Sequence, residues 1–484
     1  MTSSSYTQTL ADFAASVSFD DLPPATVIAT QRVILDTLGC VVGGSDLASS
    51  RMVRAVKTSA AGTPEATVLV TGDRLPASGA AHVNGHAGNA LDAEETIRHS
   101  GHLAAATVPP ALAVAERQTS HGADFVAAVA VGFDVAARIG LSLKHLDVGD
   151  DGRVEVAPVS GLSWATFGAT VAAGRLLGLD RDQMADALGL TVASAPLPIA
   201  GQWGTQAAPR PLTKYGLYGT MSEAGVFAAL LAAEGFRANR EALDGERGFW
   251  KIMGSSRCEW DVITDRLGTR WLVEETSYKV HPACRFASPA LDLFYELQSR
   301  ARVTADEIDQ VDLLVPQAML AKHMDDPTVV TLVDGQFSLP HLMGLAACGG
   351  PPGPAWHTQE ALDDPRVRSF ATRVRVREYP HAAPILEKLL REQGHAELIP
   401  TAASLTARGR TSTAATDHAL GDPWDTEGAL DDATLEAKFR TFCRFHLPES
   451  QINAAVAAIR DLPGATDVDG VVRPLVRASA AINS

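Results

Sequence analysis

The chain of 484 residues is 46% hydrophobic and 20% charged, which is typical of a globular protein with a large core and excludes disorder along the whole chain. Its net charge of −16 repels phosphate backbones and anionic lipids, so we expect neither a nucleic-acid partner nor a membrane-surface partner. The five cysteines form no CxxC pair, which argues against a disulfide framework and favours a reduced, cytoplasmic location.

The N-terminus has no basic segment followed by an apolar one, so we expect no signal peptide. The longest apolar stretches, such as residues 125–133, are flanked by aspartates and fall short of the roughly 20 residues that a membrane helix needs. We therefore expect no membrane-spanning segment.

Apolar residues recur at helical spacing from residue 1 to about residue 265. The predicted helices cover residues 22–43, 76–92, 109–119, 123–140, 163–178 and 220–235. Alanine is abundant on their faces, and small side chains let helix backbones approach closely. The pattern predicts a tightly packed multi-helix domain.

The pattern changes near residue 268, where a smaller α+β domain is predicted. Its expected strands are 311–315, 372–379 and 402–409, and its expected helices are 287–300 and 336–347. The polar segment 411–428 is predicted to be a connector. Helical spacing returns at 432–445 and 449–460, and we expect this tail to pack back on the first domain.

A first polar cluster lies within residues 82–112 and includes Asp92, Thr96 and His102. A carboxylate and imidazoles at a helix end, followed by small residues, fit the floor of a pocket, but they fit a solvated, capped helix end equally well. His99 and His102 are three residues apart beside acidic groups, so a metal site is geometrically possible. Such HxxH pairs usually bind nothing, and we expect no metal.

A second cluster, residues 208–219, places Arg210 and Lys214 among prolines and glycines. A cation here can hold a carboxylate, and the alternative is a solvated surface loop.

A third cluster, residues 277–292, contains Lys279, Cys284 and Arg285 where the pattern changes from helical to α+β. Domain interfaces are favoured ligand sites. The thiol of Cys284 is either perturbed by its neighbour Arg285 or, as is more common, a small buried hydrophobe.

These clusters, in this order, resemble the MmgE/PrpD family, which includes 2-methylcitrate dehydratase, cis-aconitate decarboxylase and iminodisuccinate epimerase. The resemblance covers nearly the whole chain and is carried by RVILDTLGCVVGG, HVNGHAGNALDAEET, KVHPACRFASPALD and GQFSLPHLMGLAA, at 32–44, 82–96, 279–292 and 335–347. It implies a mainly α fold, in which residues 1–267 and 425–484 form a large all-helical domain and residues 268–424 form an inserted α+β lid. It also implies a homodimer and an active site between the domains, without cofactor or metal.

The resemblance places catalytic positions at Asp92, His102 and Lys214, and substrate-binding positions at Thr96, Lys279, Cys284 and Arg285. Two positions depart from the family. A histidine that usually precedes the helix near 163 falls at about Val159, and a tyrosine of the decarboxylases falls at Leu320. Both departures argue against cis-aconitate decarboxylation, and the first also argues against ordinary methylcitrate dehydration.

Reactions of the family move a proton at a carbon beside a carboxylate, and the developing enolate needs cations or donors aimed at it. We expect His102 to act as the base, Asp92 to orient it or act as the partner acid, and Thr96 to donate a hydrogen bond. Lys214, Lys279 and Arg285 are expected to hold substrate carboxylates. The leading hypothesis is a dehydratase-type lyase of a small di- or tricarboxylic acid. The alternatives are an isomerase or epimerase, a decarboxylase, a tailoring enzyme with a larger and less polar substrate, and a non-catalytic family member.

Overall fold

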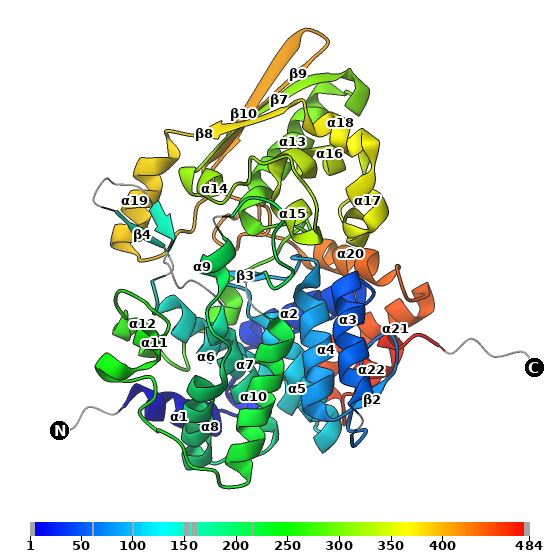
Figure 1. The fold of residues 1–484 in the computed structure, drawn as a ribbon. Helices are drawn as coiled ribbons and strands as arrows, with labels where there is room; N and C mark the ends of the chain where they lie inside the picture. The colour runs from blue at the N-terminus through cyan, green and yellow to red at the C-terminus, as the bar shows by residue number, and fades with distance from the viewer. Residues whose placement is uncertain are drawn as a thin grey trace, which may run out of the picture.

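The computed structural model describes residues 5–60, 62–98, 101–144, 146–149, 154–156, 162–204, 206–214 and 217–478. The fold is mainly α, as predicted. Figure 1 shows a broad bundle of helices with a smaller, sheet-containing region above it. Each region has its own hydrophobic core, one built from residues 10–278 and 435–475 and the other from residues 283–407.

Most helices belong to the large helical region. They are α1 (Tyr6–Ser16), α2 (Pro24–Gly44), α3 (Ala48–Ser59), α4 (Ala77–Ala90), α5 (Val108–Gln118), α6 (Gly122–Leu141), α7 (Thr166–Leu176), α8 (Arg181–Ser194), α9 (Ala200–Trp203), α10 (Tyr218–Ala233), α11 (Phe249–Ile252) and α12 (Trp260–Thr264). A Cβ added at Gly225 of α10 would lie 2.3 Å from the Cβ of Ala169 in α7. The small residues therefore do what the sequence indicated: they let helix backbones approach closely.

The C-terminal helices α20 (Asp432–Cys443), α21 (Glu449–Arg460) and α22 (Asp469–Val472) pack on this same region. In Figure 1 they lie in orange and red beside the blue N-terminal helices. Lys438 of α20 donates to Asp36 Oδ1 of α2 at 2.5 Å and to the Ala93 carbonyl at 2.6 Å. The tail thus fixes the segment that precedes Thr96.

Helix α2 corrects one expectation. It has 21 residues and, alone among the described helices, has the length and apolarity to cross a membrane, whereas the sequence analysis found no segment that long. Of its most apolar stretch, 61% is buried inside the protein. Burial of this kind is also seen in the core helices of globular proteins, and the absence of a membrane-spanning segment stays a prediction.

The smaller region contains a four-stranded sheet. Its elements are α13 (Ser288–Ala301), β7 (Ile308–Val315), α14 (Gln317–Ala321), α15 (Leu332–Phe337), α16 (Leu339–Cys348), α17 (Gln359–Asp363), α18 (Pro365–Ala371), β8 (Val374–Glu378), α19 (Ala382–Glu392), β9 (Thr401–Ala407) and β10 (Arg410–Thr416). The strand order is β10-β9-β7-β8, in which β7 and β8 are parallel and the other pairs antiparallel. Helix α13 packs on β9 and β10, and α16 packs on β8.

Strand β10 contradicts the predicted connector over 411–428. Arg408 and Gly409 both have positive φ, 51° and 67°, and form a tight turn that folds β10 back on β9. Because β10 is an edge strand of small and polar residues, most of them half-buried or exposed, it lacks the apolar alternation that marks a strand in a sequence.

Short two-stranded ladders make the remaining connections. They are β1 (Ala66–Thr67) with β2 (Arg74–Leu75), β3 (Thr96–Ile97) with β6 (Thr276–Ser277), and β4 (Leu146–Val148) with β5 (Val154–Val156). The β4–β5 ladder follows α6 in the chain yet packs on α19 of the smaller region. The β3–β6 ladder brings the first and third polar clusters together.

Candidate active site

The β3–β6 ladder sets the geometry of the candidate active site. Thr96 pairs with Ser277, so Asp92, four residues before Thr96, meets Lys279, two residues after Ser277. Asp92 has φ of 52° and Lys214 has φ of 49°. Non-glycine residues adopt this left-handed backbone rarely, and such strain concentrates at functional sites.

Asp92 is the centre of the cluster. Its carboxylate is fully buried, accepts a short hydrogen bond from Lys279 Nζ and lies 3.1 Å from Lys214 Nζ. Burial alone would raise the pKa of Asp92, but the two lysines outweigh it and hold the pKa well below its usual range. Asp92 is therefore a carboxylate throughout the neutral pH range.

Lys214 comes from the second cluster, in the segment between α9 and α10. Its Nζ also donates to the Asn89 carbonyl at 3.3 Å, and burial lowers its pKa. Lys214, His86, Asn89, Tyr218 and Gln336 line a narrow cleft with an empty volume of about 360 Å³, its mouth included. Lys214 is therefore the lysine of the cluster that lines this cleft.

His102 completes the cluster with a defined tautomer. Its Nδ1 lies 2.7 Å from the Glu95 carbonyl oxygen, which can only accept, so the proton is assigned to Nδ1. Nε2 is then the basic nitrogen, 3.6 Å from Asp92 Oδ1. Burial, followed by the charge of Lys279, lowers the pKa of His102 to about 4, so the imidazole is neutral at neutral pH.

Glu94 and Glu95 are site residues that the sequence analysis did not select. Glu94 accepts from Asn89 Nδ2 and lies 3.4 Å from His102 Nδ1. Glu95 Oε1 accepts from the backbone N–H groups of Leu103 and Ala104 at 2.6 and 2.8 Å. Burial and then the charge of Glu94 raise the pKa of Glu95 to about 8, so this carboxyl is protonated at neutral pH. Two adjacent glutamates in a sequence are usually exposed to solvent, so the sequence did not indicate that these two belong to the site. Only their burial in the structure shows it.

Thr96 lies in the same buried pocket, and its hydroxyl has no hydrogen-bond partner among the described residues. A buried polar atom without a partner is rare and calls for an explanation, and a ligand's carboxylate would supply one.

Cys284 and Arg285 face different surroundings. Cys284 is 2% exposed, and burial raises the pKa of its thiol, so it is not a reactive thiolate. The guanidinium of Arg285 binds the Asp422 carboxylate and donates to the Leu420 carbonyl at 3.0 Å. The structure thus engages Arg285 in a buried internal ion pair, and its role as a substrate clamp stays a prediction.

Arg210 of the second cluster is also committed inside the protein. It is 1% exposed, lies 3.5 Å from Asp334 and donates to the carbonyls of Lys322 and His323 at 2.7 and 3.1 Å. Arg210 therefore joins the segment that carries Lys214 to the smaller region. This position supports neither of the two interpretations of the second cluster, a solvated surface loop or a cation at Arg210 that binds a substrate carboxylate.

Of the two departures from the family, Leu320 lies in α14 and packs against the core of the smaller region. Val159 lies outside the described residues, as does His99 of the expected HxxH pair.

Among the residues that the structure describes, one set of donor groups lies close enough to bind a cation: the ligand atoms of Asp92, Glu94 and His102 fall within 4.8 Å of one another. Both oxygens of Asp92 already face lysine ammonium groups, and His102 Nδ1 faces the Glu95 carbonyl. A cation would have to displace two positive charges, so this donor set fits a metal poorly.

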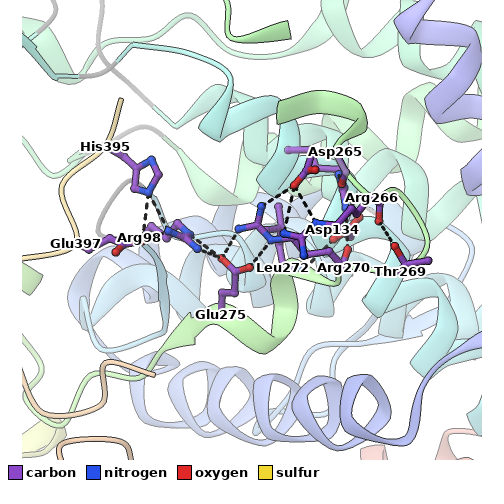
Figure 2. Close-up of polar contacts among 11 residues, drawn as sticks. Arg98, Asp134, Asp265, Arg266, Thr269, Arg270, Leu272, Glu275, His395 and Glu397 are labelled. Carbon is purple, nitrogen blue, oxygen red and sulfur yellow. Dashed lines mark hydrogen bonds and ion pairs between the residues drawn. The ribbon is translucent and has the colours of Figure 1, made fainter. Parts of the chain in front are cut away.

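A second polar network, most of it partly exposed, begins two residues after Thr96. Figure 2 shows Arg98 between His395 and Glu397 on one side and Glu275 on the other. Arg98 Nε donates to Glu275 at 2.6 Å, and Arg270 donates to the same carboxylate at 2.6 and 2.9 Å. This network, named here the Arg98 network, continues through Asp265 to Arg138 and Asp134. It links the large region to residues 395–397 of the smaller one.

The fold has two regions, and the candidate site lies beside the β3–β6 ladder of the larger one. Residues 8–260 match the MmgE/PrpD N-terminal domain and residues 281–462 the MmgE/PrpD C-terminal domain. The chain therefore belongs to the MmgE/PrpD family.

Its relatives include the cis-aconitate decarboxylases of Homo sapiens, 24% identical, and Mus musculus, 25% identical. These alignments cover 96% and 97% of this chain and 93% of each relative. The cis-aconitate decarboxylase of Aspergillus terreus is 25% identical over 61% of both chains.

Proposed function

We propose that this protein is a lyase that removes a proton from a carbon beside a carboxylate of a small di- or tricarboxylic acid, with dehydration as the leading reaction. Membership of the MmgE/PrpD family and the similarity to cis-aconitate decarboxylases support a lyase-type enzyme acting on a carboxylic acid. The observation that carries the proposal is the juxtaposition of a neutral imidazole with a carboxylate held between two lysines.

The steps follow from the protonation states. His102 Nε2 accepts the carbon-bound proton, and the resulting imidazolium is stabilised by the carboxylate of Asp92. Lys279 gives hydrogen bonds to Asp92 and to the Ala283 carbonyl at 3.1 Å, which leaves one of its three donors for a substrate carboxylate. Negative charge that develops on that carboxylate is then stabilised by a fixed ammonium group in a site shielded from water.

Lys214 is the proposed acid for the departing hydroxyl. Burial lowers its pKa, which makes the ammonium a better proton donor than an exposed lysine. It also lines the cleft, so it is the cluster's cation nearest to an entering ligand.

Proton NMR in D₂O tests the proposal, with 2-methylcitrate, citrate, cis-aconitate and iminodisuccinate as candidates. Deuterium should enter at a carbon next to a carboxylate, and the signal should vanish in His102→Ala. His121→Ala is the matched control, because His121 is exposed and precedes α6 away from the cluster. Exchange that survives His102→Ala would refute the assigned base. No exchange with any of these acids would point to a pocket built for a substrate outside the panel or to the non-catalytic alternative.

Decarboxylation is the second candidate, because the relatives named above are cis-aconitate decarboxylases over nearly their full length. The same NMR experiment separates the reactions. Dehydration forms a double bond with loss of water, decarboxylation replaces a carboxylate by a proton or deuteron with release of CO₂, and epimerisation changes neither composition nor carbon count.

A homodimer in the cytoplasm is proposed with this function. Light scattering of the purified protein would give twice the chain mass if it is correct. The net charge of −16 supports the expectation of neither nucleic-acid nor membrane partners.

A further inference from the structure

The carboxylate of Glu94 is a buried group that the steps above do not use. Glu94 is fully buried, and its Oε1 accepts a hydrogen bond from the Asn89 side-chain amide and lies 3.4 Å from His102 Nδ1. Its second oxygen, Oε2, is buried and has no hydrogen-bond partner among the residues that the structure describes. A buried carboxylate with one neutral donor is costly, and a positive charge that forms beside it reduces that cost.

The imidazole of His102 lies between two carboxylates. Asp92 Oδ1 is 3.6 Å from Nε2, and Glu94 Oε1 is 3.4 Å from Nδ1. The Asp92 carboxylate is shared by the ammonium groups of Lys279 and Lys214. In the described part of the chain, by contrast, the one basic side chain within ion-pair distance of Glu94 is His102 itself. Glu94 is therefore the carboxylate whose charge is left for the imidazole.

The charges around His102 show what Glu94 contributes. Burial and the charge of Lys279 lower the pKa of the imidazole, whereas the charge of Glu94, followed by that of Asp92, raises it. Lys214 lowers it further. Two carboxylates thus balance two ammonium groups, and without Glu94 the cluster would carry a net positive charge before any proton is taken up. Because an imidazolium is disfavoured beside like charge, Glu94 favours proton uptake by His102.

Other titratable groups near Glu94 do not cancel its charge. Lys438 donates to Asp36 at 2.5 Å, and this pair is matched within itself. Burial and then the charge of Glu94 raise the pKa of Glu95 to about 8, so Glu95 is protonated at neutral pH. Cys40 and Tyr218 are neutral there as well, because burial raises the pKa of each well above its usual range.

We propose that Glu94 is a positioning residue for the proton transfer: its carboxylate favours the tautomer with the proton on His102 Nδ1 and stabilises the imidazolium that forms when Nε2 takes the substrate's proton. The proton moves from the substrate carbon to Nε2, the electron pair of the broken C–H bond stays with the substrate, and Glu94 itself takes up no proton. This inference rests on the proposed function, because it assigns a role at the same site.

The proton affinity of His102 tests the inference without any need for turnover. In protein labelled with ¹⁵N-histidine, the ring nitrogens of His102 are assigned by their loss in His102→Gln and followed by NMR as the pH is lowered. Glu94→Gln should lower the proton affinity of Nε2 about tenfold or more, because a negative charge beside the ring is removed. Protonation should then occur at lower pH than in the unsubstituted protein. Glu94→Asp keeps the charge and should restore part of the affinity.

Deuterium exchange at saturating acid provides the second measurement. Glu94→Gln should slow exchange about three- to tenfold, since a weaker base accepts the proton more slowly. It should not weaken binding of the acid in calorimetry, because Glu94 faces Nδ1 and the substrate meets Nε2. A rate that falls while the dissociation constant does not rise is a result that a purely structural role of Glu94 would not give.

Glu116→Gln is the matched control, because the Glu116 side chain is 4% exposed and binds Thr67 and Arg74 outside the cluster. The inference is overturned if Glu94→Gln protonates His102 at the same pH as the unsubstituted protein, even if exchange is slower. Shifted protonation without exchange of any acid would retain the coupling of Glu94 to His102 and remove the proposed function. Exchange by the unsubstituted protein with unshifted protonation in the variant would do the reverse.

Discussion

The Asp92 cluster and the Arg98 network are two sets of charged side chains near β3. The first is buried, whereas most of the second is partly exposed, and the two are built differently. In the Arg98 network, arginines donate hydrogen bonds to carboxylates, so positive charges are paired with negative charges and N–H donors with oxygen acceptors. The Asp92 cluster instead places two lysines on one carboxylate, holds the Glu95 carboxyl with its pKa raised to about 8, and contains a buried hydroxyl without a described partner. Matched charges hold the regions together, whereas mismatched ones mark the place for chemistry.

His102→Gln should give the largest effect and should fall on activity. Glutamine can donate to the Glu95 carbonyl but cannot take up a proton, so deuterium exchange should fall about 10²- to 10⁴-fold. The free energy of unfolding, measured by urea denaturation, should change by less than about 1.5 kcal/mol. A variant that loses stability but keeps its exchange rate would make His102 a structural residue.

Arg138→Met should give the opposite result, a loss of stability with activity per folded molecule retained. Arg138 is 1% exposed and donates to Asp134, to the Asp265 carbonyl and to the Arg270 carbonyl. Its removal leaves Asp134 buried without a cation and should cost about 3–5 kcal/mol in urea unfolding.

The exposed pair Arg473–Asp469 provides the control for that measurement. Arg473 is 80% exposed, so Arg473→Met should cost less than about 0.5 kcal/mol. Equal losses for Arg138→Met and Arg473→Met would mean that the Arg98 network contributes no special stability.

Glu95→Gln should change the pH dependence of stability. The pKa of Glu95 is raised from 4.5 to about 8, so its contribution is complete below pH 4.5 and is lost as pH rises to 8. Glutamine does not titrate, so the difference in unfolding free energy between variant and unsubstituted protein should shift in the variant's favour from pH 5 to pH 8. Glu116→Gln, outside the cluster, is a suitable comparison, and a constant difference would show that Glu95 is ionised when folded.

His102 acts in the opposite direction. Its pKa is lowered from 6.5 to about 4, so its contribution is complete above pH 6.5 and is lost as pH falls through 4. In His102→Gln this part of the acid sensitivity should disappear between pH 6.5 and pH 4.

Chelation should give the smallest effect. Because both oxygens of Asp92 face lysines, we expect EDTA treatment to leave the exchange rate unchanged. Loss of activity that is restored by an added divalent cation would show that Asp92, Glu94 and His102 bind a metal and would reverse the interpretation of the cluster.

Much of the fold could be predicted from the sequence because its helices are long and periodic. The segment 123–140 is α6 to within a residue at either end, and 449–460 is α21. Strand β10 was missed because an edge strand of threonine, serine and alanine has no apolar face to display. The strand predicted over 311–315 is the second part of β7, whose buried and less buried residues alternate there because one face is covered.

The sequence by itself determined the family, the helical character and the residue types of the site, since Asp92, His102 and Lys279 stand in ordered, family-like segments. It could not determine which charged residues meet, because that depends on a two-residue ladder between positions about 180 residues apart. Only the tertiary structure placed Lys214 and Lys279 on one carboxylate and gave Arg285 to Asp422. Pairing and burial decide whether a charge is structural or functional, and both are properties of the folded chain.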